Sequence, residues 1–152
     1  MAVVVVFTSG IFLMNSQVLG MLRSSVESSA SARTLHSRAE QVRSSTWSQL
    51  VTAPHYANTV FAVQPDAGGD LGGLTETILV TAHLVSPGSV TPIEVRRNAN
   101  GSVTTVSPGD VQLAAQSSVR VDVTASWVGA GGRNRLRQMS LVFGEGGLSG
   151  RR

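Results

Sequence analysis

The chain has no cysteine and no lysine, few aromatic residues and few charges. Without cysteine, neither a disulfide framework nor a thiolate metal site can form. Without lysine, the glycine-rich stretches at 68–73 and 129–132 cannot be P-loops, and we interpret them as turns. All twelve basic residues are arginine, and the net charge is only +3. The arginines gather only in small clusters at 96–97, 133–137 and 151–152, which we interpret as solvated edges or tail, so we expect no nucleic-acid partner.

Catalytic and metal-binding patterns are also missing. His36, His55 and His83 have no partner at metal-ligand spacing, and His83 reads as a solvent-facing strand residue. No Gly-x-Ser-x-Gly elbow accompanies the many serines. Asp66 and Asp70 share one loop, but two carboxylates alone do not make a calcium site. We therefore expect no enzyme activity, no catalytic residue, no metal, no cofactor and no small-molecule substrate.

What the chain does have is an uncharged N-terminal stretch. Residues 1–22 carry no charged side chain, and the first charge is Arg23. As a helix this stretch would be about 33 Å long, which matches a bilayer core. We predict an apolar stem that lies in a membrane or a filament core, with packing positions at Val4, Phe7, Gly10, Ile11, Met14, Val18 and Leu22. A signal peptide cleaved near residues 28–32 is the rival, but the basic start that it needs is absent.

Residues 23–53 continue as a polar segment with apolar residues at helical spacing. The stripe formed by Leu35, Ala39, Val42, Trp47 and Leu50 predicts an amphipathic helix lying on a sheet. Pro54 is expected to end this helix near residue 52 or 53. The arginines after the stem would place the following residues in the cytoplasm. The alternative is that a basic leader precedes Met1.

Residues 54–143 read as a small antiparallel sheet. Strands are expected at 57–63, 74–86, 90–97, 102–106, 119–127 and 133–143, with an Asn-Gly hairpin turn at 98–101. On the expected strand 74–86, alternate residues from Ile78 to Leu84 should share one face. The predicted sheet core includes Val119, Val121, Val123, Trp127, Met139 and Leu141. Residues 144–152 form a glycine-rich tail. The expected fold class is α+β, a long N-terminal helix packed on this sheet.

Two local stretches carry a family resemblance. Residues 39–54 (AEQVRSSTWSQLVTAP) and residues 119–141 (VRVDVTASWVGAGGRNRLRQMSL) resemble the end of the long helix and the C-terminal hairpin of type IV pilin-like proteins, in particular minor pilins and type II secretion pseudopilins. The resemblance implies a structural filament subunit whose partners are other pilin-like subunits, met through the N-terminal helix. It also implies the bacterial inner membrane, with the head outside the cytoplasm in a periplasmic or cell-surface filament.

The family's N-terminal processing motif has no counterpart here. No processing glycine, phenylalanine and nearby glutamate can be assigned, and the first carboxylate is Glu27. Either Met1 is an internal methionine of a longer reading frame, or the chain is an unprocessed relative. Three other interpretations stay open: a signal-anchored envelope protein with a binding head, an enzyme or transport accessory with a deep polar pocket in the head, and an oligomer with residues 1–22 as a core helix.

Overall fold

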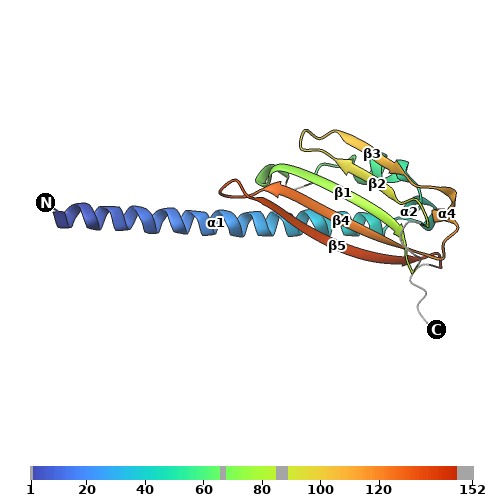
Figure 1. Ribbon diagram of the computed structural model, residues 1–152, viewed down its shortest axis with the longest axis horizontal. Helices are drawn as coiled ribbons and strands as arrows, with labels where there is room; N and C mark the ends of the chain where they lie inside the picture. The colour runs from blue at the N-terminus through green and yellow to red at the C-terminus, as the bar shows by residue number, and fades with distance from the viewer. Residues whose placement is uncertain (1, 66–67, 85–88, 147–152) are drawn as a thin grey trace.

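The computed structural model describes residues 2–65, 68–84 and 89–146, and for residues 2–13 it describes the backbone only. One helix dominates the shape of the molecule: α1 (Ala2–Arg43) is 42 residues long, and its N-terminal part projects from a compact head (Figure 1). The short helices of the head are α2 (Trp47–Leu50), α3 (Ala53–His55), the π-helix η1 (Tyr56–Val60), the 3₁₀ helix η2 (Gly68–Asp70) and α4 (Val111–Ala114).

The head is built on one five-stranded antiparallel sheet. Its strands are β1 (Gly72–Ala82), β2 (Ile93–Arg97), β3 (Val103–Pro108), β4 (Ser118–Val128) and β5 (Asn134–Gly144), in the spatial order β3-β2-β1-β4-β5. The C-terminal half of α1 lies against β4 and β5, and α3 and η1 lie against β2 and β3. The predicted α+β class, a long helix on a small antiparallel sheet, is confirmed.

The β4–β5 hairpin is the longest pairing in the sheet. Its register runs without interruption from Ser118↔Gly144 to Val128↔Asn134. The turn needs glycine at Gly131 and Gly132, whose φ values are +81° and +72°. The tip of this hairpin reaches along α1 toward the N-terminus, beyond the ends of the other strands (Figure 1). The hairpin therefore contacts α1 where the helix leaves the head.

The hydrophobic core fills the space between the helical layer and the inner face of the sheet. Leu35 and Val42 of α1 and Ile78 and Val80 of β1 are all buried in it. Side chains on alternate residues of a strand point to opposite faces, so the apolar alternation of β1 and β4 supplies this core directly. The same parity places Glu76 and Arg97 on the inner face, where both are buried.

The predicted end of the long helix is wrong. α1 ends at Arg43 rather than near Pro54, and Pro54 instead lies in the first turn of α3. The hydroxyls of Ser44 and Ser45 both donate to the carbonyl of Gln41, which gives the last turn of α1 its partners. Thr46 then caps the N-terminus of α2, where Gln49 Oε1 accepts from the Thr46 backbone N–H at 2.8 Å.

The strand expected at residues 57–63 is also wrong, because η1 occupies Tyr56–Val60. Tyr56 is fully buried, and its hydroxyl donates to the carbonyl of Leu50 at 2.7 Å. Burial raises the pKa of Tyr56 well above its ordinary value. Anchored in this way, the segment packs as a helical cover on β2 and β3 instead of pairing with them.

The other expected elements differ mainly at their ends. β1 ends at Ala82, and Leu84 lies beyond it with a φ of +64° and an almost fully exposed side chain, not on the inner face. Of the arginines interpreted as solvated, Arg97 is buried and Arg135 and Arg137 bind α1. Residues 85–86 of the expected strand and 147–152 of the expected tail, Arg151 and Arg152 included, lie outside the described residues.

Asp110 offers a pH-dependent test of this packing. Its carboxylate accepts from the backbone N–H of Thr91 at 2.9 Å and from that of Leu113 at 3.0 Å. The Thr91 bond is the main reason that the pKa of Asp110 is lowered. A carboxyl group with a lowered pKa in the folded state stabilises that state above its unfolded pKa, and this stabilisation is lost as the pH falls through the folded pKa.

We therefore expect Asp110→Asn to destabilise the head at neutral pH, and we expect the difference from the unmodified chain to shrink in acid. Urea unfolding of both proteins at several pH values measures this difference. A difference that stays constant from neutral pH to below the ordinary carboxyl range would show that the charge of Asp110 does not matter.

Candidate assembly interface

The exposed part of α1 carries a concentration of large apolar side chains. Met14 is 71% exposed and Met21 is 72% exposed, and Val18, Leu19, Leu22 and Val26 are all more than half exposed. At about 100° per residue these positions cover roughly half of the helix circumference. An apolar stripe of this width normally faces another surface. Among the described residues, no part of the head covers it.

The helix enters the head at Glu27, where its environment changes abruptly. The Glu27 carboxylate is buried and accepts from the backbone N–H of Ala130 at 2.7 Å. Glu27 Oε2 also lies 3.8 Å from Arg135 Nε. A Cβ atom on Gly129 would lie 2.6 Å from that Nε and 2.9 Å from Glu27 Oε2, so any larger residue there would displace these two side chains. The hairpin tip thus clamps α1 with a buried carboxylate.

Two arginines of β5 extend this clamp along α1. Arg135 Nη1 donates to the hydroxyl of Ser24 at 3.1 Å. Arg137 donates to the carbonyl and the hydroxyl of Ser28, at 2.8 and 3.1 Å. These bonds fix the helix axis relative to the sheet. An open cavity of about 690 Å³ lies just outside the clamp, between Leu19, Leu22 and Val26 of α1 and Ala130 and Gly131 of the hairpin.

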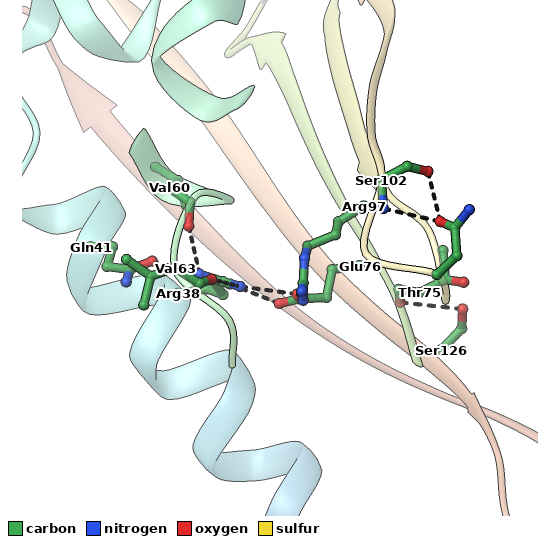
Figure 2. Close-up of polar contacts among 10 residues, drawn as sticks. Arg38, Gln41, Val60, Val63, Thr75, Glu76, Arg97, Ser102 and Ser126 are labelled. Carbon is green, nitrogen blue, oxygen red and sulfur yellow. Dashed lines mark hydrogen bonds and ion pairs between the residues drawn. The ribbon is translucent and has the colours of Figure 1, made fainter. Parts of the chain in front are cut away.

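Deeper in the head, α1 is held by a buried ion cluster (Figure 2). Arg38 Nε and Nη2 donate to the two carboxylate oxygens of Glu76, at 2.7 and 3.0 Å. Arg97 Nη1 approaches the same carboxylate from β2, at 3.1 Å. The Arg38–Glu76–Arg97 cluster joins α1 to two strands of the sheet, and its two guanidinium groups and one carboxylate leave one positive charge.

The two arginines of the cluster are satisfied very differently. A guanidinium group has five N–H donors. Arg38 uses all five: beyond Glu76 it donates to Gln41 Oε1 and to the carbonyls of Val60 and Val63, at 2.5 to 3.0 Å. Among the residues that the structure describes, the Arg97 guanidinium makes a single hydrogen bond, and its buried Nε has no partner. Leaving a buried donor unpaired costs about 1–3 kcal/mol.

The structure places the predicted site residues in two groups. Met14, Val18 and Leu22 of the predicted stem are exposed. For the other predicted stem positions, Val4, Phe7, Gly10 and Ile11, the structure describes the backbone only. Within the head, the predicted packing residues lie in or against the core: Leu35, Ala39, Val42, Leu50, Val119, Val121, Val123 and Trp127 are buried, and Trp47, Met139 and Leu141 are partly buried. Within the described part of the chain, no helix combines the length and the hydropathy that crossing a membrane requires.

The charged residues that hold the helix on the head were not predicted from the sequence. Arg38 lies three residues after Leu35 and four before Val42, so it shares their stripe. Glu76 lies on the same face of its strand as Ile78, and Arg97 lies on the same face as Val95. A charged residue at a core position on each of three elements, with both signs represented, was the signal that could have revealed the cluster.

Outside this cluster, the titratable side chains that the structure describes lie apart from one another or in simple pairs. His36 is exposed, and the Nε2 atom of His55 lies 2.7 Å from the hydroxyl of Ser45, with burial lowering the pKa of His55. Asp70 forms a surface ion pair with Arg33 at 3.8 Å. Asp66 lies outside the described residues. Among the residues that are described, no group of histidine, aspartate or glutamate side chains could hold a metal ion.

No protein family, curated protein or solved structure matches the chain.

Proposed function

We propose that the chain is a pilin-like structural subunit of a type IV pilus or of a type II secretion pseudopilus-like filament. The observation that carries this proposal is the division of α1. Its C-terminal half is fixed to the head, and its N-terminal part projects with a broad, uncovered apolar stripe. In this function the stem holds the subunit in the bacterial inner membrane, with the head outside the cytoplasm, and then packs among the stems of neighbouring subunits.

Three features of the head support a structural role of this kind. The clamp at Glu27 and the cluster at Glu76 fix the direction in which the stem leaves the head. The apolar cavity beside Leu22 and Val26 continues the stripe onto the hairpin tip, so a neighbouring helix could contact both. The resemblance of residues 39–54 and 119–141 to pilin-like proteins also favours this role. Each of these observations fits a role in assembly.

The test is photo-crosslinking in the native cells. Benzoylphenylalanine placed at Val18 should capture a second subunit, another copy or a different chain with an apolar N-terminal helix, identified by mass spectrometry of the adduct. The matched control is the same residue at Gln138, which is exposed on β5 of the head. We expect at least a tenfold higher yield of subunit adducts at Val18.

A different result identifies the main alternative, the signal-anchored envelope protein. In that case Val18 would give lipid adducts only, in a protein that stays in the membrane fraction, and the filament proposal would be rejected. Equal adduct yields at Val18 and Gln138 would also reject it, because contact through the stem would then have no preference over contact through the head.

A further inference from the structure

The arginines that lack an acidic partner all lie where the stem leaves the head. Among the residues that the structure describes, every arginine except three forms an ion pair with a carboxylate. The three exceptions are Arg23, Arg133 and Arg137. Arg23 lies on α1 about one turn before Glu27, and the other two belong to the hairpin whose tip clamps Glu27.

Two of these arginines are available to another molecule. Arg23 and Arg133 are both exposed, and neither makes a hydrogen bond or an ion pair within the described part of the chain. Arg23 lines the same open cavity as Ala130 and Gly131 of the hairpin tip, so the two guanidinium groups belong to one surface. Arg137 is partly buried and is used within the molecule, where it donates to α1.

The carboxylates at this end of the head are already neutralised. Glu27 Oε2 lies 3.8 Å from Arg135 Nε, and Asp70 Oδ2 lies 3.8 Å from Arg33 Nη2. Each of these two acidic residues thus has an arginine of its own. The charges of Arg23 and Arg133 therefore have no counterpart among the described residues, and an anionic partner must come from outside the chain.

Exposed apolar side chains surround the two arginines. Leu22 and Val26 of α1 are 58% and 52% exposed, and Val128 and Leu136 of the hairpin are 48% and 66% exposed. A surface that mixes apolar side chains with arginines suits the boundary between the acyl chains and the headgroups of a bilayer. The apolar groups enter the acyl region there, while the long arginine side chains reach the phosphates.

The position of Arg23 along the helix agrees with this boundary. It is the first charged residue of the chain and follows a stretch that is about as long as a bilayer core is thick. With the stem in a membrane, Arg23 lies at the level of the headgroups on the side of the head. Positive side chains at this level attract anionic lipids.

We propose that Arg23 and Arg133 bind the headgroups of anionic phospholipids in the membrane leaflet that faces the head. We call Arg23, Val26, Arg133 and Leu136 the stem-base surface. The inference rests on the part of the proposed function that places the stem in a membrane, and it adds the lipid class that the head contacts there. Each arginine should strengthen the contact about fivefold.

The experiment measures how close the stem-base surface lies to the headgroups. The chain has no cysteine, so Asn134→Cys places a single bimane label beside Arg133 in the full chain. The chain is reconstituted in phosphatidylcholine vesicles with a nitroxide-labelled headgroup, with and without phosphatidylglycerol. We expect about threefold stronger quenching with phosphatidylglycerol, and high salt should remove the difference.

A label at Val142 is the positional control. Val142 is exposed on the same face of β5 as Asn134, but it lies eight residues farther along the strand, about 27 Å from it. Because that end of the strand points away from the stem, the label at Val142 should be quenched little in either kind of vesicle.

Two double variants test the arginines themselves. Arg23→Gln combined with Arg133→Gln should abolish most of the phosphatidylglycerol-dependent quenching at Asn134. The matched control is Arg43→Gln combined with Arg96→Gln, which removes the same charge from exposed arginines away from the stem base. The control should behave as the unmodified chain. All four side chains are exposed, so we expect both double variants to fold.

Equal quenching at Asn134 with and without phosphatidylglycerol overturns the inference. Quenching that follows the protein-to-lipid ratio instead of the phosphatidylglycerol content also overturns it, because the arginines would then bind an acidic surface of a neighbouring subunit. Flotation of the vesicles separates these failures from a failure of the proposed function. A chain that floats with the vesicles but fails the quenching test leaves the membrane stem in place, whereas a chain that does not float rejects the membrane stem itself.

Discussion

Replacing Glu76 with glutamine is expected to lower the free energy of unfolding of the head by about 3–5 kcal/mol. The glutamine side chain has nearly the same shape, so the effect comes from charge. Without the carboxylate, Arg38 and Arg97 remain buried as two like charges with no anion in the cluster. Breaking a buried ion pair on one side is costly for this reason, even where the intact pair adds little net stability.

Glu94→Gln is the matched control for this prediction. Glu94 lies on β2 and pairs with Arg96 at 3.0 Å, but the Arg96 side chain is 46% exposed. Exposed pairs contribute about 0–1 kcal/mol. Urea unfolding of the two variants, followed by the fluorescence of Trp47 and Trp127, gives the comparison. Equal losses for Glu76→Gln and Glu94→Gln would mean that the cluster is not a stabilising contact between α1 and the sheet.

The second large effect is expected at Leu35. Its side chain is only 2% exposed and packs in the core between α1 and the sheet. Truncation to alanine removes buried apolar surface and leaves a cavity, which costs about 2–5 kcal/mol for such residues. The same unfolding measurement detects it. A loss below 1 kcal/mol would contradict the tight packing of the helix on the sheet.

Val26→Ala on the same helix provides the contrast. Val26 is 52% exposed and belongs to the apolar stripe outside the core. For the isolated subunit we expect a change within about 0.5 kcal/mol, because exposed positions contribute little to folding. Together the two variants locate the boundary between the part of α1 that stabilises the head and the part that is left for contact with other molecules.

Local sequence patterns predicted those elements of the fold in which the burial of each residue can be inferred from the residues next to it in the sequence. The strict alternation from Val119 to Trp127 predicted β4, and the Asn-Gly turn predicted the β2–β3 hairpin. In residues 57–63, β-branched and aromatic residues also favoured a strand, but the buried hydroxyl of Tyr56 and the contacts with β2 and β3 hold a π-helix there. Tertiary packing decided between two locally acceptable structures.

The candidate sites were harder to predict, because they depend on residues far apart in the sequence. The uncharged N-terminal part of α1 could be recognised from the sequence alone. The bond between Arg38 and Glu76 joins residues 38 positions apart, and no local spacing indicates it. The missing partner of Arg97 Nε among the described residues depends on the orientation of one guanidinium group, which only the structure provides. The alternation of inward-facing and outward-facing residues along the strand could have placed Glu76 in the core, but it could not have identified the residues that bind Glu76.

The way in which α1 is attached has a mechanical consequence. α1 runs along the length of the sheet (Figure 1), and its polar attachments include Ser24, Glu27, Ser28 and Arg38, spread over about 21 Å of helix. A force along the axis of the stem acts on all of these attachments at the same time, in shear. They must therefore break together. A sideways pull would open the Glu27 clamp first and then peel the helix away. The head is therefore built to transmit tension along the stem far better than bending across it.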